Sequence, residues 1–298
     1  MGYVLKTEGL TKEYDHIKAI DNISLTVNEG DIYGFVGKNG AGKTTLIRAI
    51  LGLCRVEHGS VSFFDGQDIH TAKKRVGSLV ESPSLYTNMT AFDNMRMLTS
   101  MLGTNRDKIK EILTTVGLEN TGKKKVKDFS LGMKQRLGIA MTLPGDPDFL
   151  ILDEPINGLD PTGIVEIREL LLRLHEKGIT IFVSSHYLGE LEKIATRYGI
   201  ISKGKLIEEI SQEELKEKCG SRIVLKTSNA TAAKEISDRL LKTDKTYIGS
   251  KGELFIEEKV EDIGMLTSEL FKNGVSVTGI SNDENSAEDY FIKRMEEG

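Results

Sequence analysis

The feature that most constrains this fold is a glycine-rich loop formed by Gly37, Lys38, Asn39, Gly40, Ala41, Gly42, Lys43, Thr44 and Thr45. A strand-like run, 32–36, precedes the loop, and a helix-like run, 46–51, follows it. This G-x-x-x-x-G-K-S/T pattern between a strand and a helix predicts a loop that binds phosphate groups. Glycines let successive backbone N–H groups point inward at an anion, and the helix start adds the positive end of its dipole. A glycine-rich turn that binds nothing is the alternative, and both flanking segments disfavour it.

Two side chains of this loop have chemistry suited to a nucleotide. Lys43 can reach the β- and γ-phosphates as a single positive charge, and we expect its side chain to face solvent. The Thr44 hydroxyl can ligate Mg²⁺, an ion that keeps most of its other coordination sites for water and phosphate. The loop therefore predicts a site for ATP with Mg²⁺.

The composition narrows the classes of protein that fit. The 298 residues are enough for one large domain and a small one. A formal net charge of -5 disfavours a nucleic-acid surface, which needs a basic field, so we expect no nucleic-acid partner. Cys54 and Cys219 do not suggest a disulfide framework, which indicates a reduced, cytosolic chain. No apolar run is long enough to span a bilayer, and charges such as Glu8 and Lys12 interrupt any signal-peptide core.

Two acids end a second expected strand. Residues 149–152 are all apolar, which is typical of a strand buried in a parallel sheet, and Asp153 and Glu154 follow directly. Acids at such a position are costly unless they serve a cation or a substrate. The carboxyl ends of these strands are also where open α/β sheets bind ligands. We expect Asp153 to lie beside Mg²⁺ and Glu154 to orient and deprotonate an attacking water.

Three further segments have a functional and a structural interpretation. The expected strand 179–185 ends at His186, which is either a structural histidine or a contact to the γ-phosphate. Tyr14 lies between the first expected strands and is either a base-stacking aromatic or an ordinary half-buried tyrosine. Ser130 and Gly132 begin a helix, where they offer donors to an anion or form a plain N-cap.

The pattern of expected strands and helices changes near residue 211. Residues 3–30 predict short strands, and residues from 90 to about 143 have a helical pattern. The polar segment 211–220 is a helix or linker. Strand and helix patterns then alternate over 222–227, 231–241, 247–257 (a hairpin turning at Lys251), 260–272, 275–280 and 287–295. This strand–helix–strand–strand–helix–strand order predicts a ferredoxin-like module over 221–298 with an extra helix and no catalytic cluster.

The order of these motifs resembles the ATP-binding subunit of an ABC transporter over roughly residues 1–210. The resemblance implies an α/β fold: a P-loop NTPase core with a mainly parallel sheet, an antiparallel β subdomain, and a helical signature subdomain at about 83–145. It also implies roles for site residues. Tyr14 stacks on adenine, Glu81 lies at the Q-loop near Mg²⁺, and Ser130 begins the signature segment. Asp160 lies in the D-loop, Glu154 is the catalytic base and His186 is the switch histidine.

The sequence departs from the family pattern at two places. The usual Leu-Ser-Gly-Gly-Gln signature appears as Phe129, Ser130, Leu131, Gly132 and Met133, and Glu81 replaces the usual glutamine of the Q-loop. Together with the segment 78–94 and the C-terminal module, these departures look most like subunits of exporters for bacitracin and lantibiotic peptides.

The resemblance implies a function and partners. Two such domains pack head to tail with ATP between the phosphate loop of one and the signature of the other. A separate integral membrane permease uses the hydrolysis, and the chain works at the cytoplasmic face of the cell membrane. A soluble ABC ATPase acting on ribosomes or DNA is the first alternative, although no second cassette or coiled-coil insertion is present. A P-loop kinase is the second, but it would not need the signature or His186.

Overall fold

The computed structural model describes residues 2–219, 221–243, 245–249, 252–256, 260, 262–284 and 287–297. The chain divides into two compact units. The first contains the residues up to Gln212 together with Arg294 and those after it, and the second contains Glu213–Lys293. Among the described helices, none is both long and apolar enough to cross a membrane.

A six-stranded sheet forms the centre of the first unit. Its order is β5-β6-β7-β3-β8-β9. The bounds are β3 (Ile32–Val36), β5 (Val76–Leu79), β6 (Phe149–Asp153), β7 (Thr180–Ser185), β8 (Arg197–Ser202) and β9 (Lys205–Ser211). The first five strands pair in parallel and β9 pairs antiparallel with β8. Every residue of β3, β6 and β7 is buried, which explains their continuous apolar runs.

A three-stranded antiparallel sheet with the order β2-β1-β4 accompanies the central one. Its strands are β1 (Tyr3–Tyr14), β2 (Ile17–Asn28) and β4 (His58–Phe63). The first two are longer than the sequence suggests, because register shifts at bulges let polar interruptions stay within continuous strands. The glycine-rich loop leads into α1 (Lys43–Leu51), which starts earlier than expected because the left-handed Gly42 (φ 109°) turns the chain directly into the helix. The short helix α2 (Ile69–Lys73) follows β4.

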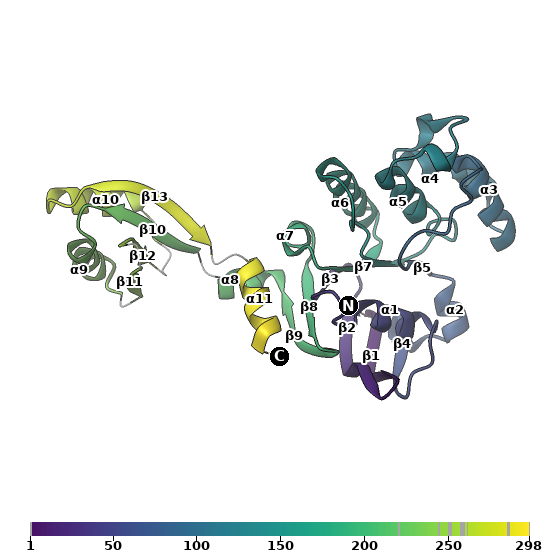
Figure 1. Cartoon of the computed structure of the whole chain (residues 1–298), viewed down its shortest axis with the longest axis horizontal. Helices are drawn as coiled ribbons and strands as arrows, with labels where there is room; N and C mark the ends of the chain where they lie inside the picture. Colours follow the sequence, from purple (N-terminus) through teal and green to yellow (C-terminus); the bar gives the residue numbers. More distant parts are fainter. Residues whose placement is uncertain are drawn as a thin grey trace. The chain divides into compact units, whose positions relative to one another are not determined.

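Helices form the remainder of the first unit. They are α3 (Ala91–Leu102), α4 (Ile109–Thr115), α5 (Leu131–Ala140), α6 (Pro161–Glu176) and α7 (Leu188–Leu191). Thr90 caps α3: its Oγ1 accepts from the Asp93 N–H at 3.1 Å and donates to the Asp93 carboxylate at 2.8 Å. Figure 1 shows α3, α4 and α5 together at one end of this unit, away from α1 and the antiparallel sheet. We call α3, α4 and α5 the helical part.

The second unit contains a four-stranded antiparallel sheet with the order β11-β12-β10-β13. It contains β10 (Ser221–Thr227), α9 (Ala230–Leu241), β11 (Thr246–Ile248), β12 (Leu254–Ile256), α10 (Ile263–Lys272) and β13 (Val277–Glu284), with most of α8 (Gln212–Cys219) and of α11 (Ala287–Glu297). Strands and helices therefore follow each other in the expected order, around a core that includes Leu225, Leu254 and Leu270. The expected turn residue Lys251 and the hairpin end Glu257 lie outside the described residues.

The end of α11 contacts the first unit, to which its last residues belong. The Met295 side chain is buried, and its backbone oxygen accepts a hydrogen bond from Ser202 Oγ at 2.9 Å. Arg294 Nε donates to Glu208 Oε2 at 2.8 Å. Arg294 and Met295 therefore form part of the first unit although they lie close to the end of the sequence.

Candidate functional site

Three parallel strands bring their carboxyl ends together at one edge of the central sheet. β3 ends before the glycine-rich loop, β6 ends at Asp153, and β7, which lies between them, ends at Ser185. A cleft of about 470 Å³ opens at this edge. Its lining includes Thr44, Glu81, Asp153 and Glu154 from the expected site, and Leu131 and Gln135 from α5.

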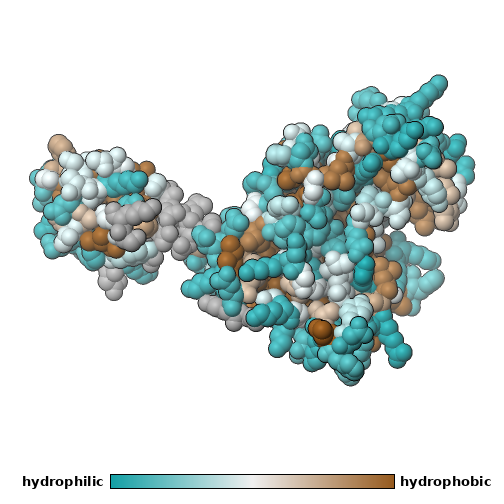
Figure 2. Space-filling model, in the orientation of Figure 1, coloured by the Kyte–Doolittle hydropathy of each residue, from teal (hydrophilic) through white to brown (hydrophobic). Residues whose placement is uncertain are grey.

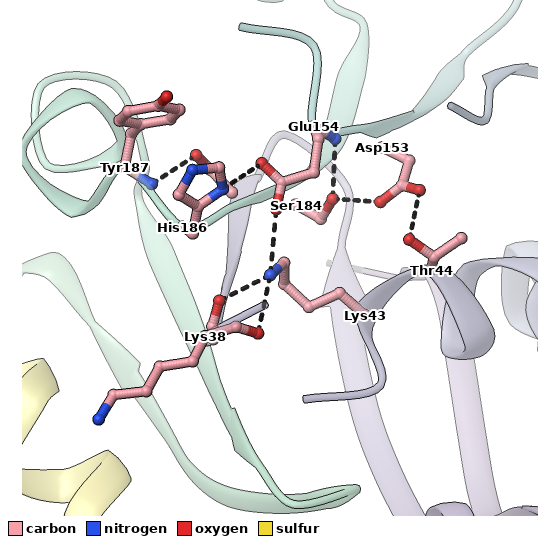
Figure 3. A network of polar contacts seen from close by, with 10 residues as sticks. Lys38, Lys43, Thr44, Asp153, Glu154, Ser184, His186 and Tyr187 are labelled. Carbon is pink, nitrogen blue, oxygen red and sulfur yellow. Dashed lines mark hydrogen bonds and ion pairs between the residues drawn. The ribbon is translucent and has the colours of Figure 1, made fainter. Parts of the chain in front are cut away.

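Lys43 is buried, with 5% of its side chain exposed, so the expectation of a solvent-facing lysine is wrong. Its ammonium group donates to the backbone oxygens of Gly37 at 2.6 Å and Lys38 at 3.3 Å. It also lies 3.0 Å from Glu154 Oε1 (Figure 3). A buried ammonium group needs such partners because burial without them costs several kcal/mol. The loop folds its carbonyl groups around the lysine, and Glu154, directly after β6, supplies the negative charge.

A line of hydrogen bonds connects the loop to β6 and β7 (Figure 3). Thr44 Oγ1 donates to Asp153 Oδ2 at 2.7 Å, and Ser184 Oγ donates to Asp153 Oδ1 at 2.6 Å. The backbone N–H of Glu154 donates to Ser184 Oγ at 2.9 Å. Both oxygens of the buried Asp153 carboxylate are therefore held by hydroxyl groups.

Glu154 lies between the lysine and the histidine. Its backbone is left-handed, with φ at 47°, a conformation that residues with side chains seldom adopt and that often marks functional sites. Its Oε2 lies 2.9 Å from His186 Nδ1. Its Oε1 is buried and, among the described residues, accepts no hydrogen bond, although it forms the ion pair with Lys43. The structure thus brings Lys43, Thr44, Asp153, Glu154 and His186 together, as the sequence predicts.

The residues at this edge fit ATP and Mg²⁺. The Thr44 hydroxyl and the Asp153 carboxylate are the hard oxygen ligands that Mg²⁺ prefers. Glu154 Oε1 is a buried acceptor that receives no hydrogen bond from the described residues. The loop also requires its glycine, since a Cβ on Gly42 would lie 2.5 Å from the Ala19 oxygen. Glycine there leaves the backbone N–H groups free to turn toward an anion.

Glu81 lines the cleft, but its carboxylate pairs with a cation on α1. Glu81 Oε1 lies 2.5 Å from Arg48 Nη2, and 58% of the Glu81 side chain is exposed. Its φ of 61° is left-handed, like that of Glu154. The expected role near Mg²⁺ therefore stays a prediction, because it requires the carboxylate to leave Arg48.

Tyr14 lies at the end of β1 with 44% of its surface exposed. The Lys12 ammonium group lies 4.7 Å from the centre of its ring, a cation–π distance. An exposed aromatic ring beside a cation could stack on a base whose phosphates contact the lysine. The same arrangement is also ordinary for a surface tyrosine that binds nothing. The adenine-stacking role stays a prediction.

The expected signature and D-loop segments lie beside each other. Ser130 is the N-cap of α5, and its Oγ accepts from the Met133 N–H at 3.2 Å. Asp160 caps α6 in the same way through the Gly163 N–H at 3.2 Å. Leu131 packs near Gly158, and a Cβ on Gly132 would lie 3.8 Å from the Gly163 Cα. Ser130 and Asp160 therefore each have a structural role as a helix cap, and their contact with a second subunit's nucleotide stays a prediction.

The remaining loop residues surround the same turn. Thr45 is half-buried on α1. Lys38, Asn39, Gly40 and Ala41 line a second hollow, together with Ser202 and Met295. The Ala41 backbone oxygen accepts from the Gly204 N–H at 2.9 Å, so the β8–β9 turn supports the loop.

Two residues of this region escaped the sequence analysis. Ser184 lies inside an expected buried strand, where a serine attracts no notice unless the neighbouring strand is known to end in acids. Arg48 lies on α1, where arginine is an ordinary helix residue. The signal that would have found Ser184 is the pair of serines at the end of an otherwise apolar strand.

Comparisons with known proteins agree with this site. The family model described as "ABC transporter" matches residues 20–157. The chain is 41% identical to the bacitracin transport ATP-binding protein BcrA of Enterococcus faecalis, over 98% of this chain and 96% of that protein. It is 42% identical to BcrA of Bacillus licheniformis, over 98% and 97%. The lantibiotic transport ATP-binding protein SrtF of Streptococcus pyogenes is 44% identical over 69% of this chain and 90% of that protein.

Solved structures show the same relationship. An ATP-binding cassette of an ABC transporter in its ADP conformation superposes with a TM-score of 0.65 at 25% identity, over 71% of this chain and 92% of that one. A dimeric ATP-binding cassette bound to ADP and Pi superposes with a TM-score of 0.61 at 25% identity, over 70% and 98%. These findings confirm the resemblance and the P-loop fold with its mixed sheet. The chain belongs to the family of ABC transporter ATP-binding proteins and is an ABC transporter ATPase.

Proposed function

We propose that this chain powers a separate membrane permease that exports an antimicrobial peptide or protects the cell against one. The observation that carries the proposal is the similarity, over almost the whole chain, to two proteins named for bacitracin transport. A third relative is named for lantibiotic transport. Bacitracin and lantibiotics are both peptide antibiotics, so the shared chemistry of the substrate is a peptide.

We propose the following roles at the edge of the central sheet. Thr44 and Asp153 hold Mg²⁺, and Mg²⁺ supplies positive charge to the β- and γ-phosphates of ATP. Lys43 exchanges the loop carbonyls and Glu154 for phosphate oxygens. Glu154, once released from the lysine, accepts a proton from the attacking water through Oε1. His186 orients that carboxylate through its contact with Oε2.

We also propose that a second ATP-binding domain completes the site. A related cassette has been solved as a dimer with ADP and Pi, which supports this arrangement. Ser130 and Gly132 of one subunit would then meet the nucleotide of the other, with Asp160 beside them. Tyr14 would stack on the adenine of its own subunit. In that arrangement the exposed Leu131 lies at the interface between subunits, where the signature departs from the usual glycine.

We propose that the permease contacts the helical part from the cytoplasmic face of the membrane. Apolar residues lie exposed among hydrophilic ones over this part of the molecule (Figure 2). They include Phe92, Met101 and Leu102 of α3. Large apolar side chains exposed on one helix support a contact with another protein. The second unit has the strand order of a ferredoxin-like module, and we propose that it contacts a partner or regulates the ATPase.

Two experiments test the proposed function. Affinity purification from detergent-solubilised native membranes should recover an integral membrane protein with this chain, whereas recovery of ribosomes or DNA would favour the soluble alternative. Cells that express the chain with its permease should tolerate more bacitracin-like or lantibiotic peptide, and cells with the Glu154→Gln variant should not. A panel of such peptides without any ATPase-dependent protection would contradict the peptide-transport proposal.

A further inference from the structure

We propose that Ser184 is a positioning residue, whose hydroxyl group fixes the Asp153 carboxylate and the Glu154 backbone relative to each other. The proposal rests on the proposed roles of these two acids. Ser184 lies on β7 directly opposite Asp153 in the parallel register, and it is fully buried. It occupies the strand between the glycine-rich loop and the two acids.

The hydrogen bonds of Ser184 have a fixed direction. A serine hydroxyl has one proton to donate and lone pairs that accept. An ionised carboxylate only accepts, so the Ser184 proton points to Asp153 Oδ1, 2.6 Å away. The lone pairs are then available to the Glu154 N–H, 2.9 Å away. The Ser184 hydroxyl group thus holds both the Asp153 side chain and the Glu154 backbone.

This arrangement acts at a position that the backbone alone would not favour. Glu154 has a left-handed φ of 47°, which residues with side chains seldom adopt. Such conformations persist when surrounding contacts hold them. The bond from the Glu154 N–H to Ser184 is such a contact, and it aims the side chain toward Lys43 and His186. The other Asp153 oxygen is held by Thr44, so Ser184 also decides how that carboxylate is turned toward the expected Mg²⁺.

The neighbouring serine provides a matched control. Ser185 is equally buried on the same strand, but consecutive side chains on a strand point to opposite faces. Its Oγ accepts a hydrogen bond from the Tyr187 N–H at 2.9 Å, away from the two acids. Ser184→Ala and Ser185→Ala therefore remove the same group from the same strand and differ in what loses its partner.

Hydrogen exchange on the full chain tests the proposal without metal or nucleotide. We expect the Glu154 amide to exchange at least about tenfold faster in Ser184→Ala, because its acceptor is gone, while the amides of β3 keep their rates. Ser184→Thr retains a hydroxyl group and should restore the slow exchange if the variant folds. Ser185→Ala should leave the Glu154 amide within about twofold of wild type. Unchanged exchange in Ser184→Ala would overturn the proposal, and faster exchange across all of β3 would show a general structural role instead.

Metal affinity provides the second measurement. Mn²⁺ binding in the presence of ADP, followed by electron paramagnetic resonance, should be about 10- to 100-fold weaker in Ser184→Ala, as is typical when a residue that orients a ligand is removed. Wild-type Mn²⁺ affinity in Ser184→Ala would contradict the positioning role while the proposed function stands. If the wild-type chain itself binds no Mn²⁺ with ADP, the proposed metal role of Asp153 fails, whatever the Ser184 variants show.

Discussion

The buried contact between Lys43 and Glu154 predicts a coupling in stability between the two residues. Lys43→Ala removes the ammonium group and leaves Glu154 Oε1 without a partner among the described residues. Breaking a buried ion pair from one side typically costs about 3–5 kcal/mol. We expect about 3 kcal/mol, the lower end of that range, because Glu154 keeps 17% exposure and its contact with His186. In a unit of this size, that corresponds to a melting temperature lowered by about 6–12 °C.

Scanning calorimetry of four proteins measures this coupling: wild type, Lys43→Ala, Glu154→Gln and the double variant. The transition that ATP shifts upward in the wild type is assigned to the first unit. Once Glu154 is neutral, loss of the lysine leaves no unpaired charge. The double variant should therefore be about 1–3 kcal/mol more stable than the sum of the two single changes predicts. Lys38→Ala, on an exposed lysine of the same loop, should stay within about 0.5 kcal/mol of wild type.

Two outcomes would refute this reasoning. Effects of Lys43→Ala and Glu154→Gln that add within about 0.5 kcal/mol would show that the two residues do not interact. A Lys43→Ala variant as stable as Lys38→Ala would show that the lysine is not buried in solution. Lys43→Ala should also lose ATP binding in isothermal titration with Mg²⁺, and unchanged affinity would refute the phosphate-binding loop.

Three further predictions follow from single residues. Glu81→Gln should keep the rate of ATP hydrolysis within about tenfold of wild type (roughly 1.4 kcal/mol), because the amide still supplies an oxygen, whereas Glu81→Ala should lower that rate further. Wild-type rates for both variants over a Mg²⁺ titration would remove Glu81 from the site. Met295→Ala should destabilise the first unit by about 2 kcal/mol or more, measured by melting temperature, because Met295 is buried. Met265 is exposed, so Met265→Ala should not have this effect, and equal effects of the two substitutions would contradict the burial of the chain end. Gly42→Ala should abolish ATP binding in titration, because the added Cβ meets the backbone of Ala19. The Cβ of Gly40→Ala has open space, so this variant should lose only about 1–2 kcal/mol of stability. Equal losses of ATP affinity in the two variants would refute this steric argument.

The sequence predicts the central sheet well because its signals are local. Continuous apolar runs identified β3, β6 and β7, and the acids after 149–152 identified the functional edge. Such runs fit strands of a parallel sheet, because both faces of that sheet are covered and every side chain of the strand is buried. The sequence does not predict the order of strands in the sheet, since it depends on contacts between residues far apart in the chain, such as Ile32 and Ile181.

What the sequence does not show is the surroundings of charged groups, and the expectation for Lys43 is wrong for this reason. The expected position of Lys43 on a loop predicts a solvent-facing side chain, and only the folded loop shows the carbonyl groups and the carboxylate that surround it. The ion pair of Glu81 with Arg48 also has no local sequence signal, because it depends on how the segment after β5 lies against α1, and the expected role of Glu81 near Mg²⁺ stays a prediction. Contacts of this kind follow from tertiary packing, which no local pattern encodes.

The central claim is that Glu154 activates water for ATP hydrolysis at the edge formed by β3, β6 and β7. Phosphate release from ATP without any acceptor, measured alongside ATP affinity for wild type and Glu154→Gln, tests it most directly. We predict that both proteins bind ATP and that the variant releases phosphate about 10²- to 10⁴-fold more slowly, since the amide cannot take a proton. Equal rates of phosphate release in the two proteins would contradict the claim.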